Sequence, residues 1–194
     1  MAKQKVFFFD LDGTLRETVS GVTFINDPKD QKPIAGASKA LSYYKSKGFT
    51  CIGVTNQGGV AAGKKSFADA LEEQQITLTL FPELDAIYFC PDFQGNSCWF
   101  VSRNNYHEVD SIHLKGSFRK PGDGMLQYSF SQFADVDLNE TWMVGDRPED
   151  LECAKAAKVN FIWAPIMRDK FVPGMHEEQI IDIERQTLLK FLAI

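Results

Sequence analysis

The sequence is poor in cysteine, the residue on which disulfide scaffolds and most structural zinc sites depend. Its 194 residues include 4 cysteines, at positions 51, 90, 98 and 153, with no framework spacing. A chain of this length can bury a sizeable core without disulfide cross-links. Cys51 and Cys153 lie within apolar or helical patterns, so we expect them to be buried thiols. The cysteine pattern therefore favours a reducing compartment.

Long hydrophobic runs are also missing. No stretch approaches the length needed to cross a bilayer. The apolar run 6–9 ends at Asp10 and is too short for a signal peptide. Hydrophobic residues make up 44% and charged residues 24%, a balance typical of globular proteins rather than disordered ones. We therefore expect a soluble, cytoplasmic protein with no membrane partner.

An excess of positive charge is absent as well. The 21 Lys and Arg residues against 26 Asp and Glu residues give a formal net charge of -5. Domains that grip the nucleic-acid backbone are usually basic. The balance argues against such binding along an extended surface, although a local basic patch remains open. We find no internal repeats and no low-complexity segment, so nothing supports a scaffold role. The sequence leaves the oligomeric state open.

What the sequence does contain is an alternation of short apolar runs with helical patterns. The apolar runs predict strands over 5–9, 49–54, 84–90, 141–144 and 160–164. The helical patterns predict helices over 34–47, 66–80, 122–134, 148–158 and 177–192. Such alternation is typical of a parallel sheet with helices on both faces. We therefore predict one α/β domain over 1–194, with a Rossmann-like three-layer fold.

Residues 91–118 interrupt this alternation. They are rich in Gly and Asn and show no sustained period, so we interpret them as an insertion outside the core. The insertion begins and ends near the carboxyl edge of the expected sheet, where loops set ligand choice. We predict that it lies over the mouth of a site, with Arg103, His107 and Lys115 available to a second anionic group. A solvated excursion without ligand contact is the alternative.

Two carboxylates follow the first expected strand. Asp10 and Asp12 leave it two residues apart, in the segment Asp-Leu-Asp-Gly-Thr. Buried carboxylates are costly without a counter-ion, and a hard divalent cation such as Mg²⁺ fits their oxygens. Aspartate is also a covalent nucleophile for phosphoryl groups. A pair of aspartates in an ordinary turn is the alternative interpretation.

Two further polar segments are candidates for binding phosphate. Thr55 and Asn56 follow the second expected strand, and the glycines after them free backbone amides to form a phosphate cradle. Arg119 and Lys120 precede a helix, and a lysine beside carboxylates can neutralise developing charge. We take Asn56 and Arg119 as candidate substrate-binding residues. Each segment taken alone has an ordinary alternative, a polar turn or a basic pair on the surface.

A second acidic segment follows the fourth expected strand. It contains Asp146, and Asp150 lies at the start of the next helix. Helix N-termini favour carboxylates, which explains Asp150 but not Asp146. In parallel α/β sheets ligands bind beyond the carboxyl ends of the strands. We therefore expect all four polar segments to meet in a single site.

The order of these segments resembles the four motifs of the haloacid dehalogenase (HAD) superfamily of phosphatases, over residues 6–165. The resemblance implies Mg²⁺-dependent hydrolysis of a phosphomonoester through an aspartyl phosphate. It makes Asp10 the nucleophile, and Asp12 the acid for the leaving oxygen and then the base for water. It also implies that the phosphoryl oxygens are held by Thr55 and Lys120, and the metal by Asp10, the carbonyl of Asp12, and Asp146, with Asp150 supporting Asp146.

Within the superfamily, residues 54–60, 119–121 and 144–150 are similar to the branch that holds heptose-bisphosphate and histidinol phosphatases. They are also similar to the phosphatase domain of polynucleotide kinase. The branch lacks a large cap domain, and the gaps between the motifs here agree with that. The heptose and histidinol enzymes carry a zinc loop, but here Asp92 stands where that loop has histidine. The Cys-x-Cys before Arg119 is absent too, so we expect no zinc.

The resemblance leaves the substrate open. We expect a small phosphorylated metabolite, such as a sugar phosphate or a nucleotide, because the chain is acidic. A 3′-phosphorylated nucleic-acid end is the alternative, since an uncapped site admits one. A third hypothesis, from another class, is an inactive relative that binds a phosphorylated ligand. Inactive relatives usually lose the nucleophile, the acid or the lysine, and all three are present here.

Overall fold

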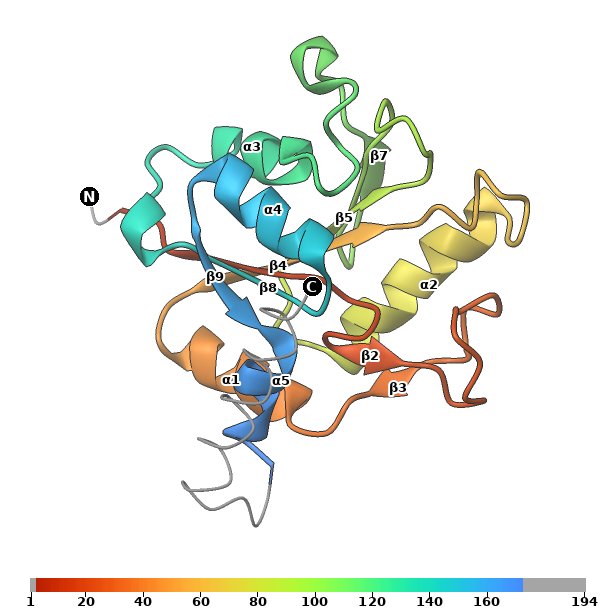
Figure 1. The fold of residues 1–194 in the computed structure, drawn as a ribbon, viewed down its shortest axis with the longest axis horizontal. Coiled ribbons are helices and arrows are strands. Elements are labelled where there is room, and N and C mark those ends of the chain that lie inside the picture. The colour runs from red at the N-terminus through yellow and green to blue at the C-terminus, as the bar shows by residue number, and fades with distance from the viewer. Residues whose placement is uncertain (1–2, 173–194) are drawn as a thin grey trace.

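The structure is a computed structural model that describes residues 3–172 (Figure 1). The expected helix over 177–192 lies outside these residues. A seven-stranded sheet runs through the described part in the order β7-β6-β5-β4-β1-β8-β9. Five of its strands are parallel: β1 (Val6–Phe9), β4 (Thr50–Asn56), β5 (Ala86–Cys90), β8 (Trp142–Gly145) and β9 (Asn160–Trp163).

Helices cover both faces of this sheet. Side chains alternate along a strand, so Phe7 and Phe9 face one way, while Val6 and Phe8 face the other. Phe7 and Phe9 pack in a core with α1 (Ala37–Ser46), α2 (Phe67–Leu80) and α5 (Ala164–Asp169). Val6 and Phe8 pack in a second core with α3 (Gly124–Ser131) and α4 (Pro148–Ala157). Figure 1 shows these two helical layers on opposite sides of the strands, which confirms the predicted Rossmann-like fold.

Local signals set most of the helix ends. Ser66 and Asp69 form the reciprocal capping box at the start of α2, and Pro148 occupies the first turn of α4. Helix α1 begins at Ala37 rather than at residue 34, because Gly36 takes a left-handed φ of 84°. A side chain there would lie 2.4 Å from the carbonyl oxygen of Arg168, so the glycine lets α5 approach. Helix α5 was not predicted.

The insertion contributes to the sheet, so its interpretation as lying outside the core is wrong in part. Two antiparallel strands, β6 (Trp99–Val101) and β7 (Tyr106–Glu108), extend the sheet beyond β5. A 3₁₀ turn, η1 (Ile112–Leu114), follows, and a second one, η2 (Leu138–Glu140), precedes β8. Strands of three residues are too short to show a period, which is why the sequence pattern missed them. The segment buries five side chains, those of Pro91, Cys98, Val101, Val109 and Phe118.

The remaining strands are short and follow the first polar segment. β2 (Arg16–Glu17) and β3 (Lys32–Pro33) pair as an antiparallel hairpin with a long loop over 18–31. All four cysteines are buried free thiols, as expected for Cys51 and Cys153. Within residues 3–172, no helix is long and apolar enough to cross a membrane.

Candidate active site

The carboxyl ends of the central strands bring the predicted segments together around a buried lysine. Strand β1 lies between β4 and β8, and the backbone N–H of Asp10 donates to the carbonyl of Val144 at 2.9 Å. The ammonium of Lys120 donates to Asp10 Oδ1 at 2.5 Å and to Asp150 Oδ1 at 2.7 Å. It also donates to the carbonyl of Val54 at 3.1 Å. Lys120 therefore joins the ends of β1 and β4 to the first turn of α4.

Burial and charge together set the protonation of this cluster. Asp10 is 7% exposed and Lys120 is 3% exposed. Burial raises the pKa of Asp10 to about 7, against the attraction of Lys120. Burial alone would lower the pKa of Lys120, but the carboxylates of Asp10 and Asp150 outweigh it and raise that pKa. The lysine is therefore always charged, whereas Asp10 titrates near neutrality while no metal is present.

The aspartates of this cluster fit a divalent cation. Oxygens of Asp10, Asp146 and Asp150 lie within 4.8 Å of one another. Asp150 Oδ2 accepts from the backbone N–H groups of Asp146 at 3.2 Å and Arg147 at 3.1 Å, so both of its oxygens are engaged. Asp146 Oδ1 is buried with no hydrogen-bond partner among the described residues, and burial raises the pKa of this carboxyl. A hard cation such as Mg²⁺ satisfies an oxygen of this kind.

Gly13 is required for the close approach of the two acidic segments. Its φ is +85°, and a Cβ at this position would lie 2.3 Å from Asp146 Oδ2. The turn is held from behind by Arg168, whose Nη1 donates to the carbonyls of Gly13 and Thr14, both at 2.7 Å. The Asp-x-Asp-Gly segment thus needs glycine for both conformation and space.

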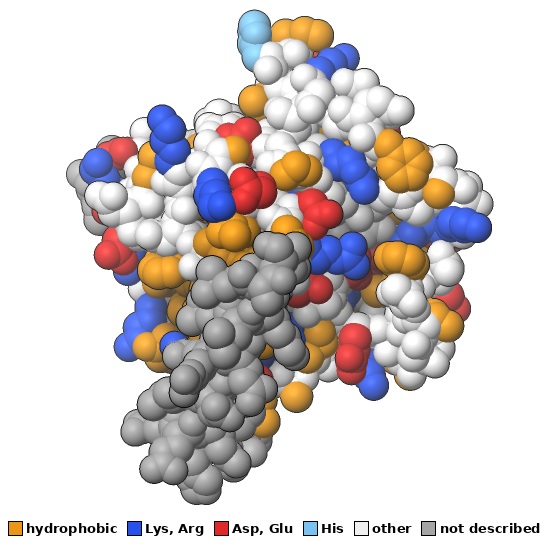
Figure 2. Space-filling view, in the orientation of Figure 1, with side chains coloured by type: hydrophobic (Ala, Val, Ile, Leu, Met, Phe, Trp, Pro, Cys, Tyr) orange, Lys and Arg blue, Asp and Glu red, His pale blue; other side chains and the backbone are white. Residues whose placement is uncertain are grey.

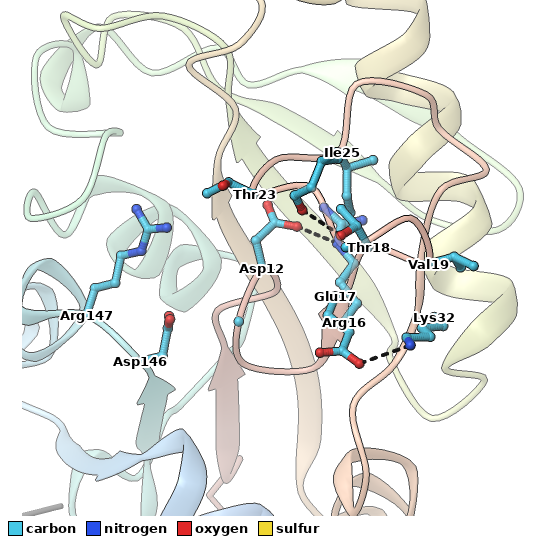
Figure 3. A pocket seen from close by; sticks show the side chains of 13 residues that line it. Asp12, Arg16, Glu17, Thr18, Val19, Thr23, Ile25, Lys32, Asp146 and Arg147 are labelled. Atoms are coloured by element: carbon cyan, nitrogen blue, oxygen red, sulfur yellow. Dashed lines mark hydrogen bonds and ion pairs between the residues drawn. The ribbon is translucent and has the colours of Figure 1, made fainter.

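The carboxylate of Asp12 is bound by Arg16 and not by Lys120. Arg16 Nε donates to Asp12 Oδ1 at 2.9 Å, as the dashed line in Figure 3 shows. The side-chain amide of Gln57 donates to Asp12 Oδ2 at 3.3 Å. Burial opposes ionisation of Asp12, but Arg16, together with the charges of Lys65 and Lys120, outweighs it and lowers the pKa of this carboxyl. Asp12 is therefore ionised in the ligand-free protein at neutral pH.

The last two residues of β4, Thr55 and Asn56, both line the cleft. The hydroxyl of Thr55 is buried and accepts from the amide of Gln57 at 3.2 Å. The side chain of Asn56 donates to the carbonyl of Lys120 at 2.9 Å and accepts from its N–H at 3.0 Å. Asn56 lines the cleft, but these two bonds use its amide to fix the backbone of the lysine.

An open cleft of about 780 Å³ leads to these groups. Two exposed aromatic side chains line it: Phe24 from the 18–31 loop is 63% exposed, and Phe93 from the insertion is 53% exposed. The guanidinium of Arg119 lies over the Phe93 ring at 5.3 Å. Figure 2 shows Lys and Arg side chains interspersed with hydrophobic ones on the side of this face where α2 and the β2–β3 hairpin lie. Charged side chains that line the cleft include those of Asp12, Lys64, Lys65 and Arg147.

A smaller cavity of about 360 Å³ adjoins the cleft beside Asp12 (Figure 3). It lies between Asp146 and the 18–31 loop, and Arg16 forms part of its lining. Asp12 and Arg147 line both cavities, so the two form one continuous depression.

The insertion reaches the cleft by one residue, and the role predicted for Arg103 is wrong. Arg103 Nη2 donates to the carbonyl of Pro82 at 2.7 Å and to that of Leu78 at 3.3 Å, where it caps the C-terminal end of α2. Because Val101 pairs with Ile87 near the start of β5, the turn after β6 lies at the opposite edge of the sheet. The exposed side chains of His107 and Lys115 are not among the described residues that line the cleft.

Asp92, the residue in place of the zinc-loop histidine, has a local structural role. Its two carboxylate oxygens accept from the backbone N–H groups of Asn96 at 3.1 Å and Ser97 at 2.7 Å. Burial raises the pKa of the neighbouring Cys90 thiol to about 11, which disfavours the thiolate. These groups are arranged to close a turn at this point in the chain.

Sequence reasoning missed four polar side chains in and behind the wall of the cleft: Arg16, Gln57, Lys65 and Glu73. Arg16 lies in a stretch that looks like a loop, and Glu73 lies in a helix whose apolar residues were expected to face inward. A buried ion pair between residues 57 positions apart leaves no local pattern, so only the fold reveals it.

Comparison with known proteins identifies relatives over most of the chain. The family described as polynucleotide kinase 3 phosphatase matches residues 5–161. The D-glycero-beta-D-manno-heptose-1,7-bisphosphate 7-phosphatase of Vibrio cholerae is 32% identical over 168 residues, which cover 82% of this chain and 79% of that protein. The same enzyme of Escherichia coli K12 is 32% identical over 169 residues, which cover 82% of this chain and 78% of that protein.

Solved structures share the fold. The D,D-heptose 1,7-bisphosphate phosphatase of B. bronchiseptica, crystallised with magnesium and phosphate, superimposes with a TM-score of 0.60 at 21% identity. The match covers 96% of this chain and 99% of that one. A structure from Mesorhizobium loti described as HAD-like gives a TM-score of 0.63 at 24% identity, covering 82% and 71% of the two chains. The match over residues 5–161 and the relatives at 32% identity show that this chain is a phosphatase of the polynucleotide kinase 3 phosphatase family.

Proposed function

We propose that this phosphatase hydrolyses phosphomonoesters with Mg²⁺ through an aspartyl phosphate at Asp10. The observation that carries the proposal is the buried Lys120 ammonium, which bonds Asp10 and Asp150 beside the unpartnered oxygen of Asp146. The carboxylate of Asp10 lies between this lysine and the candidate cation site. The positive charge on both sides lowers the electrostatic repulsion between Asp10 and a phosphate dianion. Asp10, Asp146 and the carbonyl of Asp12 would hold Mg²⁺, whose charge offsets the repulsion between carboxylate and phosphate.

In the first half of the reaction, a carboxylate oxygen of Asp10 attacks phosphorus and the bond to the ester oxygen breaks. Lys120 and Thr55 bind the phosphoryl oxygens and stabilise their developing charge. Asp12 donates a proton to the departing oxygen. The approach of a phosphate dianion raises the pKa of Asp12 against the effect of Arg16, because like charges disfavour ionisation.

In the second half of the reaction, Asp12 acts as a general base. Its carboxylate takes a proton from water, and the water oxygen attacks the phosphorus of the aspartyl phosphate. The bond between phosphorus and the Asp10 oxygen breaks, which regenerates Asp10 and releases inorganic phosphate. Asp12 ends this step protonated, ready for the next leaving group.

A small phosphorylated metabolite, such as a sugar phosphate or a nucleotide, is the substrate that we propose. The cleft of about 780 Å³ has the size of a small-molecule site. The net charge of -5 disfavours long polyanions. The relatives that align over 82% of the chain are phosphatases of a heptose bisphosphate, which is a ligand of this size.

A 3′-phosphorylated nucleic-acid end is a second candidate, favoured by one observation. Phe24 and Phe93 are exposed at the cleft beside Lys64, Arg119 and Arg147. Exposed aromatic rings beside cations form stacking platforms for bases along a single strand.

The test is a phosphate-release screen with Mg²⁺ over sugar phosphates, nucleotides and 3′-phosphorylated oligonucleotides, with Asp10→Asn as the inactive control. Preference for the small esters supports the leading proposal. Preference for oligonucleotides supports the second, and Phe24→Ala and Phe93→Ala should then lower kcat/KM at least about tenfold. Tyr106→Ala, which changes an exposed aromatic residue on β7, is the matched control. No release from any compound, with binding of one of them by calorimetry, would instead support an inactive phospho-ligand-binding protein.

A further inference from the structure

Five side chains form a closed ring of hydrogen bonds that extends from the wall of the cleft to helix α2. Arg16 Nε donates to Asp12 Oδ1 at 2.9 Å, and Arg16 Nη2 donates to Glu73 Oε1 at 2.5 Å. The ammonium of Lys65 donates to the other oxygen of Glu73 and to Gln57 Oε1, the latter at 2.8 Å. The amide nitrogen of Gln57 closes the ring by donating to Asp12 Oδ2 at 3.3 Å.

The side chain of Asp12 is 37% exposed, the other four members of the ring are buried, and the charges of the ring balance. Arg16 and Glu73 are fully buried at 0% exposure, and Gln57 and the Lys65 side chain are also buried. Two carboxylates alternate with two cations around it, so the ring is neutral as a whole. Removing one charge from a buried pair leaves its partner uncompensated, which costs far more than breaking a surface pair. The members are therefore held in one arrangement.

The ring is anchored to helix α2 by more than its own bonds. Arg16 Nη1 donates to the hydroxyl of Thr77 and, at 3.2 Å, to Gln31 Oε1. The Thr77 hydroxyl in turn lies 2.8 Å from the carbonyl of Glu73, one turn earlier in the same helix. Both oxygens of Asp12 are thus fixed to a rigid element from two directions.

We propose that Arg16, Gln57, Lys65 and Glu73 are positioning residues that hold the Asp12 carboxylate in the orientation required for proton transfer. This inference rests on the proposed function, in which Asp12 serves both half-reactions. Proton transfer by a side chain demands hydrogen-bond reach to the reacting oxygen, and support from surrounding residues sets that geometry. Glu73 is the sharpest probe, because it lines neither cavity and so cannot touch substrate.

The experiment compares Glu73→Gln with wild type, each with and without Asp12→Asn. Glu73→Gln keeps the size of the side chain and removes one charge of the ring. We expect kcat on an alkyl phosphate to fall about tenfold or more, with KM within about twofold, because part of a general acid–base contribution is lost. In the Asp12→Asn background, Glu73→Gln should cause no further loss. Leu78→Ala, a buried residue of the same helix outside the ring, should lower the melting temperature without changing kcat.

A second variant tests the same inference if Glu73→Gln does not fold. Lys65→Met breaks the bonds to Glu73 and Gln57 and should show the same dependence on Asp12. A loss of equal size in the Asp12→Asn background would overturn the inference, as would wild-type kcat in both variants.

A readout independent of turnover separates the inference from the proposed function. In wild type, NMR should show slow solvent exchange of the Arg16 Nε–H and of the Gln57 side-chain amide protons, and faster exchange in Glu73→Gln. An inactive wild type with these protons protected would refute the proposed function while leaving the ring intact. An active wild type in which they exchange freely would refute the ring.

Discussion

Replacing Asp10, the proposed nucleophile, with its isosteric amide should abolish turnover and stabilise the metal-free protein above pH 7. Asp10 is 7% exposed, and its pKa rises from 3.8 to about 7 because burial disfavours the charged form. At about 1.4 kcal/mol per pKa unit, the full rise corresponds to about 4 kcal/mol. Since the titration of Asp10 is coupled to that of a neighbouring carboxylate, we expect about 2–4 kcal/mol for Asp10→Asn.

The sign follows from proton uptake. The folded protein binds a proton at Asp10 more tightly than the unfolded chain, so wild-type stability falls as pH rises from 3.8 to about 7 and is then level. The side-chain amide that replaces this carboxyl does not titrate, so that loss is absent from Asp10→Asn. The advantage of the variant should therefore be near zero at pH 4, grow through this window, and be complete above pH 7.

The assay is thermal unfolding in chelator between pH 4 and pH 8.5. For a chain of 194 residues, the expected difference above pH 7 is roughly 5–15 °C in Tm. Mg²⁺ should then raise the Tm of wild type more than that of the variant, because a ligand that binds the native state stabilises it. A pH-independent difference, or a variant less stable than wild type at pH 8, would refute the electrostatic reasoning. Substantial hydrolysis of an aryl phosphate by folded Asp10→Asn would refute the nucleophile.

Three further predictions concern the metal and the acid. Chelation should abolish turnover, and Ca²⁺ in place of Mg²⁺ should suppress it, because Ca²⁺ accepts more ligands in looser geometry; full activity after exhaustive chelation contradicts this. Asp12→Asn should slow hydrolysis of an alkyl phosphate by about 10²–10⁴ and of an activated aryl phosphate by less, because a good leaving group needs no proton; wild-type steady-state rates on the alkyl phosphate argue against the assignment. Gly13→Ala should weaken Mg²⁺ binding in a calorimetric titration, because its Cβ would lie 2.3 Å from Asp146 Oδ2, and should cost about 1–2 kcal/mol in backbone strain; unchanged affinity would show that the turn tolerates the side chain.

Much of the fold was predictable because its signals are local. The five parallel strands were expected within a few residues of their observed bounds, since a buried strand is a short continuous apolar run. The capping box at Ser66 and the proline at the start of α4 were readable for the same reason. The start of α1 and the strands of the insertion were not, because they depend on the approach of α5 and on pairing with β5.

Two of the catalytic candidates were also predictable from sequence, because each follows a strand directly. Asp10 and Asp146 stand where β1 and β8 end, and neighbouring parallel strands carry such residues to one edge. Lys120 was named from its position before a helix, and the structure brings its ammonium between Asp10 and Asp150. The roles of these residues in the reaction stay predictions.

The sequence by itself thus determined the order of strands and helices, the acidic and basic segments that end them, and the superfamily that they resemble. The tertiary structure alone decided that Arg103 caps α2 instead of binding ligand, and that Phe93 and Phe24 meet at one cleft. It alone decided that Glu73, a polar residue of a helix, is buried against Arg16. The physical reason is the separation along the sequence over which each kind of interaction acts. Strand, cap and turn preferences act within a few residues, whereas a buried ion pair between positions 16 and 73 exists only once the core has excluded water around it.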